Sequence, residues 1–267
     1  MCMLCDKIEK VDLPFFLEAM GTDWIAEEKF DGDRVRMRVK NGKISLFNRR
    51  GIEVTERYPE FFGVNIDRDM FLDGEMCVLD ANGLSQFNEG IAFRTHCKNE
   101  DSIFEAAEAY PVTFVIFDIL EIDNNDIKDT AWTERRKQLE TLDLKGPFKI
   151  SQVNSDIMQM WDYVTKRGGE GIILKRKSAF YFEGRRSSNW RKVKDIKEAD
   201  IIVTKYTVNP KGIRVETDEG IACQVSGYNA PPVQEILDKN GEAEITIRHL
   251  GWTGKRYRQP TYMKLVH

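Results

Sequence analysis

The chain has 267 residues, a formal net charge of −4 and 41% hydrophobic residues, which suits one large domain or one medium and one small domain. No apolar run approaches the roughly 18 residues of a membrane span, which argues against a membrane partner. The first residues lack the apolar core of a signal peptide, so we expect a cytoplasmic protein.

Five cysteines, an odd number in a chain without an export signal, favour free thiols over a disulfide framework. Cys2 and Cys5 form a C-x-x-C pair, which raises zinc or redox chemistry. The sequence holds no second such pair and only three histidines, so a four-ligand zinc site is disfavoured.

Cations gather in two blocks, although the chain is acidic overall. Residues 29–50 hold eight Lys and Arg against two Asp, and residues 175–194 hold eight against one Glu. The net charge argues against a nucleic-acid binder, but the two blocks indicate a basic groove on an acidic body. The alternative is a pair of solvated strand faces.

The first predicted elements are strands. Residues 34–47 alternate apolar and cationic side chains around an Asn-Gly pair, which predicts a hairpin with a two-residue turn. Residues 71–79 are predicted to form the next strand. Residues 112–120 are apolar at nearly every position, which predicts a buried central strand, and residues 171–175 form another short strand.

Helical periodicity follows in residues 132–142 and 155–168, the second with Ser155 as its N-cap and Gly168 as its stop. After Asp195 the pattern changes to short β-rich segments separated by Gly, Pro and Asn. No strong helix is expected there apart from a possible turn at 233–237. This pattern is typical of a small β-barrel.

Acidic residues surround Lys29 in the stretch EEKFDGDR (27–34). An amine attacks phosphorus only when unprotonated, and burial with nearby cations lowers the pKa of a lysine. If Lys29 is a nucleophile, we expect Glu27, Asp31 and Asp33 to point elsewhere, while Gly32 permits a tight turn at the sheet mouth. A mixed-charge surface loop is the alternative.

Six short elements occur in order: KFDGDR (29–34), NRRG (48–51), LDGE (72–75), VIFDIL (115–120), EGIILK (170–175) and WRKVK (190–194). This series resembles the covalent nucleotidyltransferase superfamily and, within it, the ATP-dependent DNA ligases of the minimal phage or bacterial type. The resemblance runs from about residue 24 to 196 and more faintly to the C-terminus. It implies an α+β fold with two domains. Residues 1–196 form an ATP-grasp-like adenylation (nucleotidyltransferase) domain of antiparallel sheets flanked by helices, and residues 197–267 form an OB-fold β-barrel.

The resemblance also implies the reaction. Lys29 attacks the α-phosphate of ATP and becomes lysyl-AMP, AMP passes to the 5′-phosphate of nicked duplex DNA, and the 3′-hydroxyl displaces AMP. Such displacements depend on alignment and on cations. Mg²⁺ is the expected metal, with Mn²⁺ as a substitute, and the protein is expected to be a monomer.

Residue roles follow from the same resemblance. Glu27 accepts a hydrogen bond from the adenine amino group, and Asp31 orients the amine or binds metal indirectly. Arg34 holds the ribose or a phosphate edge. Arg49 grips phosphate, since a guanidinium fork suits phosphate. Relatives usually carry Ser where Asn48 stands.

Two acids and one aromatic complete the expected nucleotide site. Glu75 binds the ribose hydroxyl, and Glu75 or Glu170 binds Mg²⁺, which needs few carboxylates. Phe117 stacks on adenine, although its strand alone would predict a core residue.

The last basic block supplies phosphate ligands. Lys192 and Lys194 share one face of a strand, reach the triphosphate and are the cations expected to lower the pKa of Lys29. Lys175 and Arg186 are further phosphate candidates.

The C-terminal stretch RQPTYMK (258–264) looks like a degenerate last ligase motif, in which Arg258 and Lys264 orient the pyrophosphate. Trp252, Tyr257 and Tyr262 either stack on bases or fill the barrel core.

Three alternatives stay open. An RNA ligase uses the same lysine but usually has a small residue where Arg34 stands, and an mRNA-capping guanylyltransferase uses GTP. A non-catalytic nucleic-acid-binding module would be expected to have lost Lys29 or the carboxylates, which are all present.

Overall fold

The structure is a computed structural model that describes residues 1–252 and 254–266, with the backbone alone at residues 88 and 89. Its chain forms two compact units, Met1–Val193 and Lys194–His267. Across the described residues, no helix is long and apolar enough to cross a membrane.

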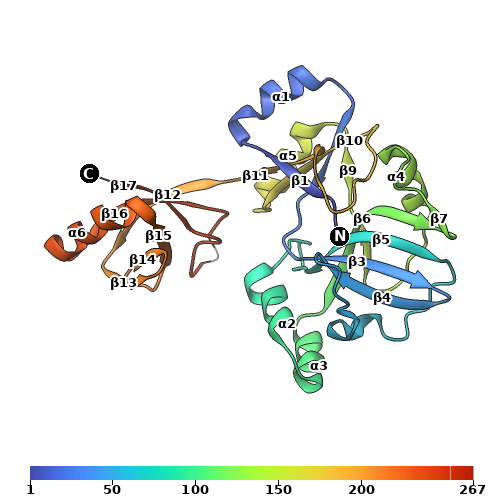
Figure 1. Cartoon of the computed structure of the whole chain (residues 1–267), viewed down its shortest axis with the longest axis horizontal. Helices are drawn as coiled ribbons and strands as arrows, with labels where there is room; N and C mark the ends of the chain where they lie inside the picture. The colour runs from blue at the N-terminus through green and yellow to red at the C-terminus, as the bar shows by residue number, and fades with distance from the viewer. Residues whose placement is uncertain (253, 267) are drawn as a thin grey trace. The chain divides into compact units, whose positions relative to one another are not determined.

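Two β-sheets build the first unit (Figure 1). The larger sheet has the order β4-β3-β5-β6-β7, with β8 also paired to β6, and the smaller has the order β1-β11-β10-β2-β9. The strands of the larger sheet are β3 (Asp33–Lys40), β4 (Lys43–Asn48), β5 (Met70–Val78), β6 (Val112–Ile122), β7 (Asn125–Asp126) and β8 (Phe148–Ile150). Those of the smaller sheet are β1 (Leu4–Ile8), β2 (Trp24–Glu28), β9 (Val153–Asn154), β10 (Gly171–Arg176) and β11 (Arg186–Lys194).

Helices cover both sheets of this unit. They are α1 (Leu13–Met20), α2 (Ala92–His96), α3 (Glu100–Ala109), α4 (Trp132–Glu140) and α5 (Ile157–Lys166), with short turns η1 (Lys10–Asp12), η2 (Thr55–Arg57), η3 (Pro59–Phe61) and η4 (Phe87–Ile91). Leu13 of α1 and Trp161 of α5 pack on the smaller sheet, while Leu139 of α4 packs on the larger. Burying these apolar faces is what holds short helices in place.

The predicted hairpin is confirmed as β3 and β4. Asn41 and Gly42 both have positive φ, 49° and 74°, as a two-residue hairpin turn with the right twist requires. The predicted strands at 71–79, 112–120 and 171–175 are β5, β6 and β10. Helix α5 is also confirmed, but its N-cap is Asp156, whose carboxylate accepts from the Gln159 N–H at 2.9 Å, and not Ser155.

The two sheets of the first unit meet at a small apolar cluster. Met3, Tyr181 and Trp190 are buried there together with Phe71 and Leu120 of the larger sheet. Strand β1 pairs parallel with β11, which draws the first residues of the chain across this junction. The polar residues of the site therefore lie against this apolar cluster.

The second unit contains two three-stranded sheets and one helix. The sheets have the orders β12-β16-β17 and β13-β14-β15. The elements are β12 (Lys197–Val203), β13 (Lys205–Asn209), β14 (Gly212–Glu216), β15 (Ala222–Ser226), η5 (Gly227–Asn229), α6 (Ala230–Asn240), β16 (Ala243–His249) and β17 (Thr261–Leu265). The expectation of no strong helix was wrong. The eleven residues of α6 bury Val233 and Leu237 and end at Gly241, whose φ is 80°.

Candidate active site: a cavity around Lys29

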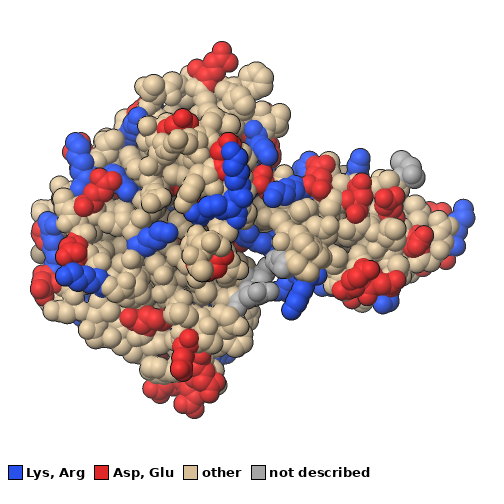
Figure 2. Space-filling view, turned by 180° about the vertical axis from the view of Figure 1, so that it is seen from behind, with Lys and Arg blue, Asp and Glu red and all other residues tan. Residues whose placement is uncertain are grey.

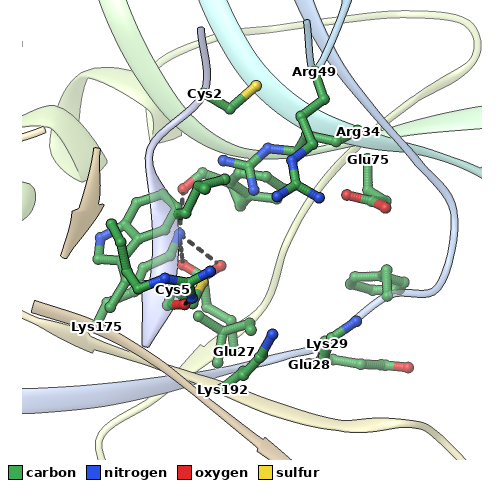
Figure 3. Close-up of a pocket in the computed structure, with 16 residues that line it drawn as sticks. Cys2, Cys5, Glu27, Glu28, Lys29, Arg34, Arg49, Glu75, Lys175 and Lys192 are labelled. Atoms are coloured by element: carbon green, nitrogen blue, oxygen red, sulfur yellow. Dashed lines mark hydrogen bonds and ion pairs between the residues drawn. The ribbon is translucent and has the colours of Figure 1, made fainter. Parts of the chain in front are cut away.

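One cavity in the first unit collects most of the predicted site residues (Figure 3). Its lining includes nine of them: Glu27, Lys29, Arg34, Arg49, Glu75, Phe117, Lys175, Arg186 and Lys192. Among the described residues, three expected members are not part of the lining: Asp31, Glu170 and Lys194. The side chains come from both sheets, so the cavity exists only once the two sheets have packed together.

Lys29 follows β2 directly, and its backbone N–H donates to the carbonyl of Gly171 at 2.9 Å, which fixes the residue between β2 and β10. The Lys29 Nζ lies 2.5 Å from Oε2 of Glu170. Burial alone would lower the pKa of Lys29, but the carboxylates of Glu170, Glu75 and Asp31 raise it above its usual value.

This result corrects one expectation. We expected cations to crowd the amine and lower the pKa of Lys29, but the charges that act most strongly on it are carboxylates. Glu27 pairs with Lys175 and Asp33 accepts from Tyr58, so both point elsewhere, as expected. The charge of Asp31, in contrast, helps to raise the pKa of Lys29. Contact with Glu170 therefore favours the ammonium form of Lys29.

Gly32 serves a different purpose from the expected turn. Its φ is not positive, but a Cβ at this position would overlap the carbonyl oxygen of Met76 and lie 2.9 Å from Sγ of Cys77. Only a glycine lets the chain after Lys29 lie this close to β5. The close approach brings Glu75 of β5 beside the lysine.

Glu75 and Glu170 form a donor pair suited to a hard cation. Burial raises the pKa of Glu75 to about 7, with Asp33 and Glu170 adding to the rise and Arg34 and Lys29 opposing it. Mg²⁺ prefers carboxylate oxygens and needs few of them, since it keeps several of its waters. The chemistry of these two side chains therefore fits a magnesium ion.

Glu27 and Lys175 are paired at the buried end of the cavity. Lys175 Nζ donates to Glu27 at 2.9 Å and to the carbonyl of Phe117 at 2.8 Å, and Ser151 Oγ donates to Glu27 at 3.2 Å. Burial raises the pKa of Glu27 and lowers the pKa of Lys175. Lys175 is thus held beside the base-binding candidates Glu27 and Phe117, and not among the exposed cations.

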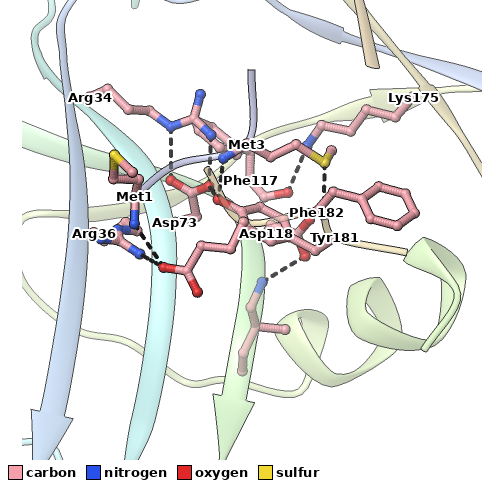
Figure 4. Close-up of polar contacts among 12 residues, drawn as sticks. Met1, Met3, Arg34, Arg36, Asp73, Phe117, Asp118, Lys175, Tyr181 and Phe182 are labelled. Atoms are coloured by element: carbon pink, nitrogen blue, oxygen red, sulfur yellow. Dashed lines mark hydrogen bonds and ion pairs between the residues drawn. The ribbon is translucent and has the colours of Figure 1, made fainter. Parts of the chain in front are cut away.

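Arg34 is held rigidly by Asp73 (Figure 4). Two parallel hydrogen bonds, of 2.8 and 2.7 Å, join its guanidinium to the carboxylate of Asp73, which is fully buried. Tyr181 Oη donates to the same carboxylate at 2.6 Å and accepts from the Met3 N–H at 3.0 Å. The guanidinium carbon lies 4.5 Å from the centroid of the Phe117 ring, so Arg34 and Phe117 share one wall.

Arg49 reaches the cavity from a turn built by Asn48. The Asn48 side-chain oxygen accepts from the backbone N–H groups of Arg50 and Ile52 at 2.9 and 3.1 Å, and Gly51 closes the turn at φ 84°. Asn therefore builds this turn in place of the usual Ser of the resemblance. Arg49 itself is exposed and available to an anion.

Lys192 and Arg186 approach from β11. Figure 3 shows the Lys192 amine directed into the same space as Lys29. Arg186 donates to the carbonyl of Cys5 and so ties β11 to β1 at the cavity edge. Lys194 lies two residues beyond Lys192 in the same strand.

Sequence reasoning assigned no site role to seven lining residues, which are Cys2, Leu4, Cys5, Glu28, Phe30, Ile173 and Trp190. Trp190 is 1% exposed, and Lys175 Nζ lies 4.2 Å from its ring centroid. In the sequence, the motif WRKVK around Trp190 indicated a role only for its two lysines. Cys2 and Cys5 were left without a role, and both line the cavity as free thiols. Burial raises the pKa of Cys2 to about 11, so its thiol stays protonated at neutral pH.

Comparison with known proteins agrees with this geometry. Residues 2–194 match the family described as ATP dependent DNA ligase domain. The chain is 30% identical over 250 residues to the bifunctional non-homologous end joining protein LigD of Bacillus subtilis, covering 83% of this chain and 41% of that protein. It thus spans less than half the length of this relative.

Solved structures share the fold. The ligase domain of LigD from M. tuberculosis superposes with a TM-score of 0.62 at 23% identity, over 99% of this chain and 94% of that one. A Lig E DNA ligase, described as binding DNA with a minimal scaffold, superposes with a TM-score of 0.65 at 18% identity, over 99% and 98% of the two chains. With the match over residues 2–194, we conclude that the chain belongs to the family of ATP-dependent DNA ligase domains.

Proposed function

We propose that this protein seals nicks between a 5′-phosphate and a 3′-hydroxyl in duplex DNA, using ATP and a lysyl-AMP intermediate. The observation that carries the proposal is the convergence of Lys29, the carboxylate of Glu75 and three cations on one cavity, with Glu170 in contact with the Lys29 amine. Arg34, Arg49 and Lys192 are those cations. An exposed basic surface would be enough to bind DNA. The convergence of these groups on one cavity is suited instead to the transfer of a nucleotidyl group.

Adenine is proposed to bind at the buried end of the cavity. Glu27 offers a carboxylate for the exocyclic amine, and Phe117 offers a ring face, because it is the partly exposed residue of an otherwise buried stretch of β6. The phosphates then extend toward Arg34, Arg49 and Lys192. Separating an apolar end from a cationic end fixes the direction in which the nucleotide binds.

The chemical step needs the neutral amine of Lys29. Its Nζ attacks the α-phosphorus, the bond from that phosphorus to the β-phosphate oxygen breaks, and pyrophosphate leaves. Glu170 is in contact with the ammonium and is the nearest acceptor for the proton that Nζ must lose. Mg²⁺ held by Glu75 and Glu170 would supply positive charge beside the phosphate oxygens. Arg34 is held in place because Asp73 accepts hydrogen bonds from its Nε and Nη2.

The same proposal extends to the second unit and to DNA. Residues 1–196 are proposed to be the adenylation domain and residues 197–267 an OB-fold domain, supported by two short antiparallel sheets with a helix between β15 and β16. Figure 2 shows acidic side chains gathered on the part of the first unit that carries α3, where Glu100, Asp101, Glu105 and Glu108 occur. We therefore expect DNA phosphates to avoid that end. A cytoplasmic monomer and Mn²⁺ as a substitute metal stay predictions.

Labelled ATP tests the proposal. Incubation with α-labelled ATP and Mg²⁺ should label the chain through an acid-labile bond, and Lys29→Ala should abolish the label. Lys43→Ala removes an exposed lysine of β4 and should leave labelling unchanged. Equal labelling by GTP would point to a capping enzyme, and sealing of nicked RNA in preference to nicked DNA would point to an RNA ligase. Absence of any adduct would refute ligase chemistry.

A further inference from the structure

A buried serine lies behind Glu27, the residue proposed to bind the adenine amine. Ser151 is 1% exposed, and its Oγ donates to the Glu27 carboxylate at 3.2 Å. It stands between β8 and β9, where the chain passes from the larger sheet to the smaller one within two residues. Its N–H donates to the carbonyl of Ile116 at 2.8 Å, and Val153 pairs with Glu27 across β9 and β2. The position of Ser151 is therefore fixed by both sheets.

Arg136 of α4 holds Ser151 in turn. Its Nη2 donates to the Ser151 carbonyl at 2.8 Å, and its Nη1 donates to the Ser151 Oγ at 3.4 Å. The side chain of Arg136 is buried, and its Nε donates to the exposed Glu140 at 2.7 Å. A series of hydrogen bonds thus runs from Arg136 through Ser151 to Glu27, which lines the cavity.

This series can run in one direction only. A guanidinium donates and never accepts, so the Ser151 oxygen is the acceptor for Arg136 and its hydrogen is left for Glu27. From β10, Lys175 Nζ also donates to Glu27, at 2.9 Å, and to the carbonyl of Phe117 at 2.8 Å. Glu27 therefore receives hydrogens from both of its neighbours and keeps acceptor lone pairs for a ligand.

Two buried cations oppose protonation of Glu27. Burial raises the pKa of this carboxyl, the charges of Lys175 and Arg136 lower it again, and Asp118 adds to the rise. Without Arg136 the effect of burial would meet less opposition. A protonated carboxyl can donate as well as accept, so the charge of Arg136 favours a Glu27 that only accepts.

An acceptor-only carboxylate distinguishes purines by the group at position 6. Adenine carries an amine there, which donates, whereas guanine and hypoxanthine carry an oxygen, which accepts. An oxygen placed against an ionised carboxylate leaves two acceptors facing each other in a buried site, which is a costly mismatch. Selection for adenine therefore depends on Glu27 remaining an acceptor.

We propose that Ser151 and Arg136 are positioning residues that set the base selectivity of the nucleotide site, by holding Glu27 as a hydrogen-bond acceptor toward a purine 6-amino group. Neither is among the described residues that line the cavity, so both act through Glu27. The proposal rests on the ligase function proposed above and supplies the reason for a preference for ATP over GTP. The alternative is a structural role, in which the two residues only join α4 to the crossing between the sheets.

Three α-labelled nucleotides that differ at position 6 test the proposal. ATP offers an amine, a purine ribonucleoside triphosphate offers only a C–H group, and inosine triphosphate offers an oxygen. At subsaturating nucleotide, the initial rate of Lys29 labelling in the wild-type chain should fall in that order. Ser151→Ala should reduce the preference for ATP over the other two roughly 5- to 10-fold, the scale of one hydrogen bond. An equal loss of rate with all three nucleotides would mean a structural role and overturn the proposal.

Two substitutions separate the charge of Arg136 from its size. Arg136→Met removes the charge and the donors, and it should reduce the preference for ATP over inosine triphosphate most, because a protonated Glu27 can donate to the oxygen. Arg136→Lys keeps the charge and should retain more of the preference. Lys137→Ala is the matched control, since it removes an exposed cation of the same helix and should leave the ratios unchanged. Wild-type ratios in Arg136→Met, or an equal change in Lys137→Ala, would overturn the role of Arg136.

Nucleotide binding gives a readout that is independent of the chemical step. Calorimetric titration of the Lys29→Ala chain, which cannot form the adduct, measures the Kd of the same three nucleotides. Adding Ser151→Ala to this chain should shift the ratios of these Kd values toward one. Each ratio comes from one protein preparation, so a partial loss of folded protein cancels from it. Unchanged Kd ratios would overturn the proposal.

Labelling of the wild-type chain keeps the two proposals apart. Absence of label with every nucleotide would refute the ligase function. Label that forms equally well from ATP and from inosine triphosphate would leave the lysine chemistry intact and refute the base selectivity alone.

Discussion

The Lys29 ammonium lies 2.5 Å from a carboxylate oxygen of Glu170, a residue 141 positions further along the chain. Glu170 is 1% exposed at its side chain and Lys29 is 21% exposed, so water screens the pair weakly. In this pair Lys29 is protonated, and a protonated amine cannot act as the nucleophile that we propose. The proposed function therefore requires that nucleotide binding weaken this ion pair before Lys29 attacks phosphorus.

Replacing Glu170 with Gln should change how the rate of lysyl-AMP formation depends on pH. The carboxylate raises the pKa of Lys29, so its removal should lower that pKa and move the rising limb of the profile to lower pH. The maximum rate should fall roughly 10- to 100-fold, because a proposed metal ligand is lost. Glu28→Gln is the control, since Glu28 lines the cavity but pairs with Arg167 at 3.1 Å. An unshifted profile in Glu170→Gln would show that the pair does not set the proton affinity of the amine.

Glu75 should make the nucleotide-free protein less stable as the pH rises from about 4.5 to about 7. The pKa of this carboxyl rises from 4.5 to about 7 on folding, so the folded state binds the extra proton in that interval. Stability contributed by the protonated form is present below 4.5 and is lost as the pH passes 7. Since Glu75 is partly exposed, we expect at most about 3 kcal/mol.

Urea unfolding of the wild type and of Glu75→Gln checks this linkage. The difference between their free energies of unfolding should grow in favour of the variant between pH 4.5 and pH 7 and then stay constant. A difference that is the same at both ends of the interval would mean that Glu75 titrates normally in the folded chain.

Much of this site was predictable because its residues sit at fixed places in short motifs. The alternation in β3 and β4 and the apolar run of β6 gave the strands that carry Arg34 and Phe117. Pairings across the chain were not predictable, because register and packing decide them. Asp73 and Tyr181 are 108 positions apart, yet they meet around Arg34.

The pKa of Lys29 was predicted with the wrong sign for the same reason. Sequence spacing shows that acids surround the lysine, but only the packed sheets show that Glu170 contacts it. Helix α6 was missed because Pro231 and Pro232 read as loop residues, although a helix accepts proline in its first turn. The sequence left Trp252 either in the barrel core or as a base-stacking residue, and its 51% exposure excludes the core.

Gly32→Ala should destabilise the chain more than an ordinary glycine substitution. The added methyl group would overlap the Met76 carbonyl oxygen, which is backbone of β5 and cannot rotate away. We expect a loss of about 3 kcal/mol or more in the free energy of unfolding. Gly63→Ala is the comparison, because Gly63 has a φ of 75° with open space around it and should lose only about 1 kcal/mol. Equal losses in urea unfolding would mean that β5 moves aside without cost.

Tyr181→Phe should loosen the support of Arg34. The change removes a 2.6 Å hydrogen bond to the fully buried Asp73 and the acceptor of the Met3 N–H, so we expect a loss of about 2 kcal/mol in stability. The KM for ATP in the labelling reaction should rise with it, because Arg34 is then less firmly placed. Tyr163→Phe, at an exposed tyrosine of α5, should change neither quantity measurably. A stability loss with an unchanged KM would leave the Asp73 network with a structural role only.

Lys192→Ala should separate nucleotide chemistry from DNA binding. Lys192 projects from β11 into the cavity with Lys29, so its loss removes one cation from the proposed triphosphate site. The rate of lysyl-AMP formation should fall about 100-fold, the effect of removing one well-placed charge-stabilising donor. Affinity for nicked DNA should change by less than about threefold, because many other phosphate contacts remain. Lys43→Ala controls for the loss of a lysine from the same unit, and equal losses of labelling and DNA binding in Lys192→Ala would make Lys192 a DNA contact instead.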